Sequence, residues 1–299
     1  MDISTNYNTS IVAVARSISY ECIQARLAVY DLETKYQTPE FAVRYDFGGQ
    51  RLALSRDDQC CFVGCYNVHG LAAYSAMDGS ELWRRKDLKA VQSVDSFPFD
   101  DFVFCGREGV GHLLCTKTGQ TIEKLRGVKA VYCSPFGRLV LISARSLEVH
   151  SPLGTRIGKI TRTTFAELDC CFSDSEILVT ESGGAVRCFD LASLELLWTY
   201  TLQEKGGHFL RLSFNQALGC FVGIHWHYKD STAPAMRIVH FERRTGLVIR
   251  EVPLGTTSRH TFCLAGSIIF TAELRLVSVE TGKVIHEFRQ HSNNDDHTA

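Results

Sequence analysis

The stretches LAAYSAMDGSELWRR (residues 71–85) and LRLVSVETGKVIHEFR (residues 274–289) share one layout. Each has a short apolar segment, a polar or aromatic step, a turn that contains glycine, and a second apolar segment. The unit occurs seven times, with turn positions at Thr34, Gly79, Gly119, Gly154, Ser193, Gly246 and Gly282. Successive turns are 45, 40, 35, 39, 53 and 36 residues apart, a period typical of propeller blades. We therefore predict an all-β fold, a single seven-bladed β-propeller of four-stranded antiparallel blades.

The bulk composition is that of an ordinary globular protein. The chain has 299 residues, of which 45% are hydrophobic and 22% charged. A closed array of repeats needs no interior linker, so we predict one propeller domain over residues 1–290 and a polar, flexible tail over 291–299. The blades are expected at about 10–48, 49–88, 89–127, 128–161, 162–204, 205–255 and 256–290.

The second copy shows how one blade is built. In residues 51–59, apolar and polar side chains alternate until a polar turn. Residues 60–66 form an almost continuous apolar run. Residues 80–88 interleave charged with apolar residues. This pattern predicts a buried inner pair of strands and an exposed outer edge. The first copy lacks an obvious inner strand. We expect the extreme amino terminus, MDISTN, to supply it; the alternative is a ring that closes by a cruder contact.

Short polar turns between the first two strands of several blades carry a recognisable pattern. They are SRDDQ (55–59), SPFGR (134–138), SDSE (173–176) and SFNQA (213–217). Ser and Asp side chains in such turns bond the backbone of the turn itself. These turns resemble those of the WD-repeat family, although Tyr30-Asp31 and Phe189-Asp190 stand where that family has Trp-Asp. The glycine turns followed by Trp83 and Trp198 are similar to pyrroloquinoline-quinone-type propeller repeats. The resemblance, over about residues 16–290, implies a propeller used as a binding scaffold and carries over no catalytic residue.

The charge balance argues against a polyanionic partner. Lysine and arginine number 32 against 33 acidic residues, a formal net charge of -1. Such a chain has no global field that would attract nucleic acid or an anionic membrane. The basic runs WRRK (83–86) and ERR (242–244) fall at different blade edges and are expected to be solvated outer strands. We therefore predict neither a nucleic-acid nor a membrane partner.

The amino terminus and the cysteines predict a cytoplasmic protein. The first ten residues are polar, and no stretch approaches the roughly 18 apolar residues that span a bilayer. Most of the twelve cysteines lie inside apolar runs, where a free thiol behaves as a small hydrophobic group. In the adjacent pairs Cys60-Cys61 and Cys170-Cys171, the two thiols should face opposite sides of a strand.

The sequence lacks the usual signatures of catalysis. It has no G-x-S-x-G elbow, no phosphate-binding glycine loop and no Cys-x-x-Cys pair. We predict no catalytic residue, no cofactor and no metal site. The unusual segment HWHYKD (225–230) has two interpretations. His225 and His227 would share one face of a strand and could bind zinc together with Asp230. The favoured interpretation is a contact surface built on Trp226 and Tyr228.

This segment is predicted to lie in the connection between the second and third strands of blade six, the blade with the 53-residue step. In a propeller these connections emerge on the same face as those between blades. Aromatic and charged residues there have the composition of a protein-binding hot spot. The predicted partner-binding residues are His225, Trp226, His227, Tyr228, Lys229, Asp230, Lys205, Arg162, Arg259 and His260.

The function expected from these features is a non-catalytic interaction scaffold, or adaptor subunit, that binds a protein partner, for example within a multi-subunit complex. One alternative is an inhibitor or immunity-type protein that blocks a partner enzyme or toxin. A second alternative is a metal-dependent hydrolase whose acidic and histidine residues line the central mouth.

Overall fold

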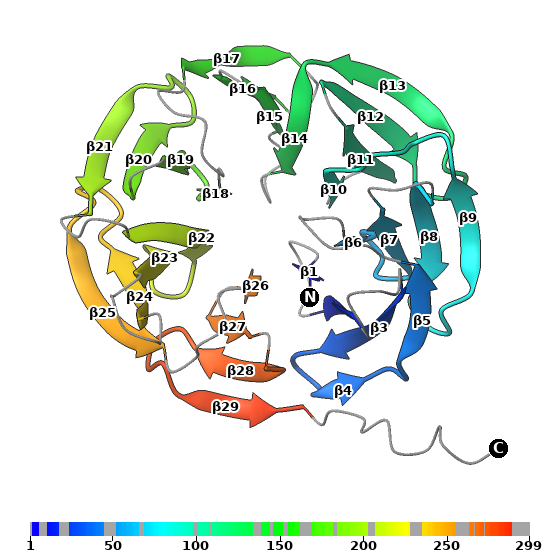
Figure 1. Cartoon of the computed structure of the whole chain (residues 1–299). Coiled ribbons are helices and arrows are strands. Elements are labelled where there is room, and N and C mark those ends of the chain that lie inside the picture. The colour runs from blue at the N-terminus through cyan, green and yellow to red at the C-terminus, as the bar shows by residue number, and fades with distance from the viewer. Residues whose placement is uncertain are drawn as a thin grey trace.

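Seven antiparallel sheets surround a common axis in the computed structural model of the chain (Figure 1). The predicted fold class is confirmed. The structure describes residues 2–5, 11–17, 24–44, 52–65, 69–97, 101–107, 109–133, 139–143, 146–151, 155–161, 169–181, 184–202, 207–227, 235–254, 263–265, 267–271 and 273–288. The expected tail at 291–299 lies outside these residues.

Each blade is one continuous stretch of chain whose strands run from the axis outward. Blade one contains β1 (Asp2–Thr5), β2 (Ile11–Ser17), β3 (Gln24–Asp31), β4 (Tyr36–Gln37) and β5 (Phe41–Arg44). Blade two contains β6 (Leu52–Leu54), β7 (Cys60–Gly64), β8 (Leu71–Ser75) and β9 (Glu81–Arg85). Blade three contains β10 (Ser93–Ser96), β11 (Phe102–Arg107), β12 (Val110–Cys115) and β13 (Thr121–Arg126). Blade four contains β14 (Val128–Cys133), β15 (Leu139–Ser143), β16 (Ser146–His150) and β17 (Arg156–Thr161).

The remaining three blades follow the same order. Blade five contains β18 (Cys170–Phe172), β19 (Glu176–Glu181), β20 (Ala185–Asp190) and β21 (Leu196–Thr201). Blade six contains β22 (Gly207–Asn215), β23 (Cys220–His227), β24 (Ala235–Phe241) and β25 (Val248–Leu254). Blade seven contains β26 (Cys263–Ala265), β27 (Ile268–Phe270), β28 (Arg275–Ser278) and β29 (Val284–Glu287).

Blade one differs from the others at both ends. Its innermost strand is β1, which pairs antiparallel with β2 from Asp2 opposite Ala15 to Thr5 opposite Val12. The expectation that the amino terminus supplies this strand is confirmed. Its outer edge is divided, because the short strands β4 and β5 both pair with β3. The outer rim of blade one is therefore built differently from that of the other blades.

Apolar clusters fill the spaces between neighbouring blades. Seven such clusters occur among the described residues, one for each pair of neighbours around the ring. Cys61 belongs to the cluster shared with blade one, whereas Cys60 packs against the cluster shared with blade three. Cys170 and Cys171 are divided in the same way between blades four and six. The prediction that adjacent thiols face opposite sides of a strand is confirmed.

Aromatic packing closes the ring between blades seven and one. Tyr30 of blade one lies with its ring centroid 5.3 Å from that of Phe270 and 4.9 Å from that of Phe288, both in blade seven. The Tyr30–Phe288 pair is edge-to-face, a favourable arrangement for two aromatic rings. Each blade is complete in itself, so side-chain packing closes this ring without exchange of a strand between the two ends of the chain.

Tryptophan rings on outer strands cover the glycine turn of the following blade. A Cβ atom at Gly119 would lie 2.7 Å from the ring of Trp83, and one at Gly246 would overlap the ring of Trp198. The indole of Trp83 also donates a hydrogen bond to the carbonyl of Thr116 at 2.7 Å, and that of Trp198 to Arg243 at 2.9 Å. Each indole is therefore held by a hydrogen bond and packs directly on the backbone of a glycine, where any side chain would collide with the ring.

Two other interfaces keep the same complementarity of size with different residues. Between blades one and two, Phe41 covers Gly79. Between blades four and five the sizes are exchanged. The outer strand has Gly158, and the turn residue that corresponds to the glycines of the other blades is Leu194, with a positive φ of 58°, one position after the expected Ser193. A Cβ atom at Gly158 would lie 2.6 Å from the Leu194 side chain. A large residue on one blade thus meets a small one on the next in each case.

The polar turns bond their own backbone as predicted, with one difference. The Ser55 hydroxyl donates to Asp57 at 2.6 Å and accepts the Cys60 N–H at 2.9 Å. Ser173 accepts the Glu176 N–H at 2.9 Å. In blade six, Asn215 caps the turn by accepting the Leu218 N–H, because β22 extends to Asn215 and includes the serine expected in this role. The turn at 134–138 lies outside the described residues.

We predict that Gly119→Ala destabilises the protein more than Gly109→Ala. Both glycines have a φ of 68°, so alanine costs the same left-handed strain at either site, about 1–2 kcal/mol. No described atom lies near a Cβ at Gly109, whereas at Gly119 the Trp83 ring must move, which costs a further ~1–3 kcal/mol. Urea unfolding of both variants measures the difference. Equal free energies of unfolding would contradict the proposed contact.

Candidate functional site

The described part of the predicted partner segment is in the interior. His225, Trp226 and His227 are the last three residues of strand β23, not part of a connection. Trp226 is 6% exposed, and His225 is also buried. Placing Trp226 in an exposed loop was therefore wrong. The sequence did not reveal the end of this strand, because its last three residues, His-Trp-His, resemble the polar and aromatic residues of a loop.

Trp226 packs at the interface between blades six and seven. It belongs to the apolar cluster that contains Met236 of blade six together with Ile269 and Val277 of blade seven. The ring of His208 lies edge-on to it, with centroids 4.6 Å apart. Such an environment makes Trp226 part of the core and removes it from the candidate binding surface.

The other seven predicted partner-binding residues lie outside the described part of the structure. These are Tyr228, Lys229, Asp230, Lys205, Arg162, Arg259 and His260. Their role stays a prediction. His225 and His227 have ring centroids 6.5 Å apart, and the third ligand of the zinc alternative, Asp230, is among the residues not described. Within the described ranges, no three His, Cys, Asp or Glu residues are placed to hold a metal ion.

Charged groups lie near the axis at the inner edges of blades three, five and six. Asp169, which precedes β18, accepts the Leu212 N–H of the next blade at 2.5 Å and lies 3.9 Å from the Arg211 guanidinium. Burial raises the pKa of Asp169, while the Arg211 charge and the Leu212 N–H lower it. Burial also raises the pKa of Asp95 in β10 to about 7, opposed by a hydrogen bond from the Val131 backbone and by Arg211.

This axial arrangement is chiefly structural. Asp95 accepts a hydrogen bond from the backbone of the following blade, as Asp169 does. Ser93 repeats the pattern, since its hydroxyl donates to the Lys129 carbonyl at 2.8 Å. Inner-strand side chains therefore fasten one blade to the next. Asp169 accepts a backbone N–H and lies near an arginine, so its hydrogen bonds and charge are satisfied within the protein and do not indicate a bound ligand.

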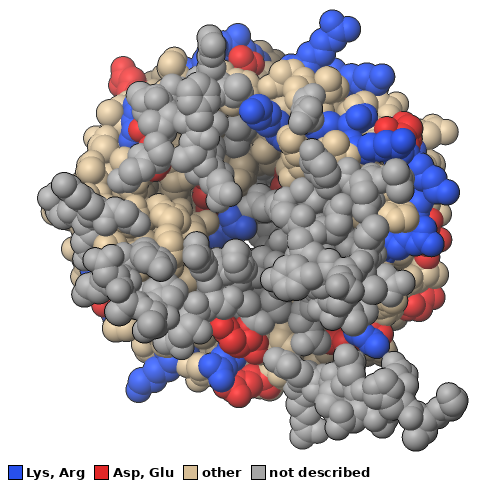
Figure 2. Space-filling model, in the orientation of Figure 1, with Lys and Arg blue, Asp and Glu red and all other residues tan. Residues whose placement is uncertain are grey.

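Lysine and arginine side chains gather on the rim over β9 and β13 (Figure 2). On β9, Trp83 and Arg85 face blade three, where Arg85 donates to the Gly119 carbonyl at 2.6 Å. Arg84 faces the other way, and its side chain is 9% exposed. Interpreting this run as a solvated edge was wrong for Arg84. In the second basic run, Arg243 is paired with Glu176 of blade five at 2.7 Å, so this run is also partly structural.

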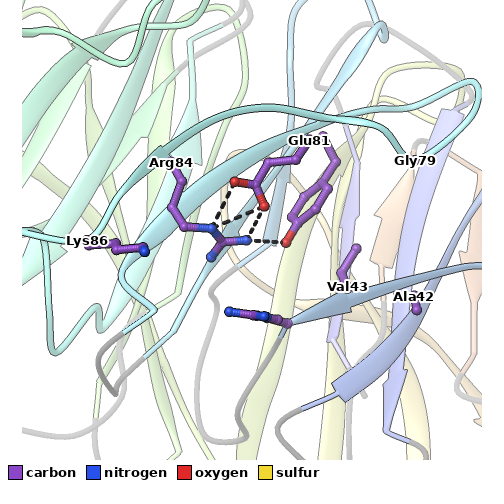
Figure 3. Close-up of a pocket in the computed structure, with 8 residues that line it drawn as sticks. Ala42, Val43, Gly79, Glu81, Arg84 and Lys86 are labelled. Carbon is purple, nitrogen blue, oxygen red and sulfur yellow. Dashed lines mark hydrogen bonds and ion pairs between the residues drawn. The ribbon is translucent and has the colours of Figure 1, made fainter.

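Arg84 lines a cavity of about 520 Å³ between blades one and two (Figure 3). One side is formed by β5 and the other by β8, β9 and the residue after β9. The lining residues are Ala42, Val43, Arg44, Tyr74, Gly79, Glu81, Arg84 and Lys86. Figure 3 shows Arg84 and Glu81 facing each other, with Lys86 pointing into the space between them and β5.

A hydrogen-bond network holds the Arg84 guanidinium in place. Its Nε atom donates to Glu81 at 3.0 Å, one terminal nitrogen donates to the Tyr74 hydroxyl at 2.6 Å, and the other donates to the His69 carbonyl at 3.1 Å. The hydrogen bond from Arg84 lowers the pKa of Glu81, and the charges of Arg84, Arg44 and Lys86 act in the same direction. Burial raises the pKa of Tyr74. The cavity therefore has a fixed polar wall.

Three cations and one carboxylate line this cavity, so its lining carries two excess positive charges. Among the described residues, no carboxylate forms an ion pair with Arg44 or Lys86. The Arg44 guanidinium lies 3.4 Å from a ring nitrogen of His69. One signal in the sequence could have indicated this site. Arg84 and Lys86 are two residues apart in an extended segment, so their side chains point to the same side.

The outer strands form a second exposed feature. In six blades a large apolar residue stands at the same position, three residues after the turn residue. These are Leu82, Ile122, Ile157, Leu197, Ile249 and Ile285. Blades five to seven each add a second, namely Leu196, Leu247 and Val284. The six residues of these three blades are 46–67% exposed. Exposed apolar side chains repeated on adjacent blades are available for contact with another protein.

Comparisons with solved structures agree with the fold. The C-terminal WD40 domain of Sif2 aligns with a TM-score of 0.58 and 12% identity, over 90% of this chain and 91% of that chain. BamB from Moraxella catarrhalis aligns with a TM-score of 0.57 and 13% identity, over 93% and 82%. The computationally designed Ika8 protein gives 0.57 and 15%, over 95% and 85%. The chain is thus a seven-bladed propeller that resembles both WD40 and BamB propellers.

Comparison at the level of sequence identifies no relative of this chain. No protein-family model matches the chain, and no curated protein matches it. At 12–15% identity, the structural similarities show the fold alone. In the described ranges, no helix has the length and apolarity needed to cross a bilayer.

We predict that Trp226→Ala lowers the free energy of unfolding by about 3–5 kcal/mol, the usual cost of removing a buried aromatic side chain. Tyr36→Ala, at an exposed aromatic position, should change it by about 0.5 kcal/mol or less. Chemical denaturation of both variants provides the test. A Trp226→Ala variant as stable as the parent would restore this residue as a surface anchor.

We predict that Asp95→Asn gains stability relative to the parent as the pH rises. The pKa of Asp95 is about 7 in the folded protein against 3.8 for an unperturbed group, so protonation favours folding. The contribution of Asp95 is complete below about pH 4 and is lost through pH 7. Asparagine keeps the acceptor for Val131 and does not ionise. Urea titrations between about pH 4 and pH 8 should diverge; parallel stabilities would show that Asp95 has no raised pKa.

Proposed function

We propose that this protein is a non-catalytic interaction scaffold, an adaptor that binds a protein partner. The observation that carries the proposal is the exposed apolar set on the outer strands of blades five to seven. We call this set the apolar rim: Leu196, Leu197, Leu247, Ile249, Val284 and Ile285. Five of these residues stand on β21, β25 and β29, which are fixed by the sheets and by contacts between blades, and Leu247 immediately precedes β25.

The physical basis is the cost of leaving these side chains in water. Burial of apolar surface contributes about 25 cal/mol per Å². A rigid scaffold loses little conformational freedom on binding, so more of this gain remains as affinity. Ion pairs lie among and beside these residues, such as Arg275 with Glu287 at 2.8 Å and Arg250 with Glu280 at 3.9 Å. Protein interfaces likewise combine apolar contact residues with polar and charged groups.

A partner should be lost when the apolar rim is made acidic. We expect the triple variant Leu197→Glu, Ile249→Glu, Ile285→Glu to reduce recovery of a bound protein from native lysate at least tenfold, because each carboxylate would have to be desolvated in the interface. The measurement is an affinity pull-down with quantitative mass spectrometry, after the variant is shown to melt like the parent.

The repeat supplies a matched control. Leu82→Glu, Ile122→Glu, Ile157→Glu places the same three charges at the same repeat position on blades two to four. A partner lost only with the rim variant supports the proposal. Equal recovery with both variants would move the binding surface to the loop face, and no specific partner for the parent protein would count against a scaffold. The absence of catalysis and the cytoplasmic location stay predictions.

A further inference from the structure

We propose that the cavity between blades one and two binds an acidic polypeptide segment, through carboxylates placed between Arg44 and Lys86. This inference rests on the proposed function, since the segment would belong to a protein partner. The site is distinct from the apolar rim. Strands β5 and β9 lie across the ring from β21 and β25, and β4 lies between β5 and the rim strand β29 of the neighbouring blade (Figure 1).

The first argument is charge. Arg44, Arg84 and Lys86 face one carboxylate, Glu81, which is already engaged by Arg84. Within the described lining, the excess positive charge therefore resides on Arg44 and Lys86, which approach the cavity from different blades. An anion placed between them would interact with both and would join blade one to blade two. The protein as a whole has a net charge of -1, so this positive site is a local feature.

The second argument is the rigidity of the cavity wall. The guanidinium of Arg84 is held by Glu81, Tyr74 and the His69 carbonyl, so it does not need to be ordered when a ligand binds. The opposite wall is part of β5, where Val43 is buried in the cluster between the blades. Phe41 of the same strand is fixed over Gly79. Preorganised walls reduce the entropic cost of binding.

The third argument distinguishes a peptide from a small ion. The cavity volume of about 520 Å³ far exceeds the ~30 Å³ occupied by one water molecule in the liquid. Part of the lining is apolar, because it is formed by Ala42, Val43 and Gly79. A phosphate or sulfate ion would leave that part unfilled, whereas the methylene groups and backbone of a glutamate-containing segment would contact it. An elongated ligand with at least two carboxylates fits both the charge and the shape.

The test is direct binding of fluorescein-labelled hexaglutamate, measured by fluorescence anisotropy. The parent protein should bind it and should bind labelled hexaglutamine at least tenfold more weakly. Affinity should fall when salt is increased, because partly exposed charges are screened. Arg44→Ala, Lys86→Ala should weaken hexaglutamate binding at least tenfold.

A matched variant separates this site from general electrostatics. Arg244→Ala, Lys283→Ala removes the same two charges at exposed positions on blades six and seven and should leave affinity within twofold of the parent. Equal weakening by both double variants would overturn the proposal. Displacement of the label by inorganic phosphate as effectively as by unlabelled hexaglutamate would identify a small-anion site instead. Binding to phosphatidylserine vesicles without binding to hexaglutamate would also overturn the proposal.

A variant that increases the charge provides a test in the opposite direction. Glu81→Gln raises the excess charge of the described lining from two to three, and Arg84 keeps its bonds to Tyr74 and the His69 carbonyl. Hexaglutamate should bind at least threefold more tightly to this variant; unchanged or weaker binding contradicts the proposal. The rim variant should bind hexaglutamate like the parent. A partner captured through the rim without hexaglutamate binding would reject this inference alone, whereas hexaglutamate binding without any partner would reject the scaffold.

Discussion

The ring depends on complementarity of size between an outer strand and the turn of the following blade, which the described residues show at four interfaces. Trp83 over Gly119 and Trp198 over Gly246 are its clearest examples, and each indole also donates a hydrogen bond to the blade that it covers. Protein interiors are close-packed, so a contact of this kind fixes the distance and angle between two sheets. Repeated at these interfaces, and combined with an apolar cluster between every pair of neighbours, it fixes how successive blades pack around the axis.

The candidate peptide site follows from the one interface where the outer edge is divided. Blade one ends in β4 and β5 instead of one long strand, and Phe41, not tryptophan, covers the glycine turn of blade two. Arg44, three residues further along β5, then faces Arg84 and Lys86 across the cavity. Blades five to seven, which extend from the far side of the ring to the neighbour of blade one, have regular outer strands with exposed apolar residues. A scaffold with two chemically different surfaces could hold two different protein segments at once.

The repeat period was sufficient to predict the fold, because each blade buries its inner strands and exposes its outer one. The amino-terminal strand was also predictable, since blade one was short of one strand. Side-chain environments were less predictable. Trp226 resembles an interface anchor in the sequence, yet β23 carries it into the cluster between blades six and seven. Arg84 resembles a solvated charge, yet strand parity and the divided edge of blade one place it in a cavity. The environments of Trp226 and Arg84 both depend on which residues of the neighbouring blade pack against each face of a strand. The sequence of a single repeat does not specify those residues.

Exchange of the residue sizes between blades four and five is the most direct test of this account. Gly158→Trp should clash with Leu194, and Leu194→Gly should remove that clash and the positive-φ strain at the same position. A double-mutant cycle by urea denaturation should therefore show that the two changes together are at least ~1 kcal/mol more stable than the sum of their separate effects, within the range of couplings between contacting residues. Effects that add to within ~0.5 kcal/mol would show that the two positions are independent and would contradict size complementarity as the organising constraint of the ring.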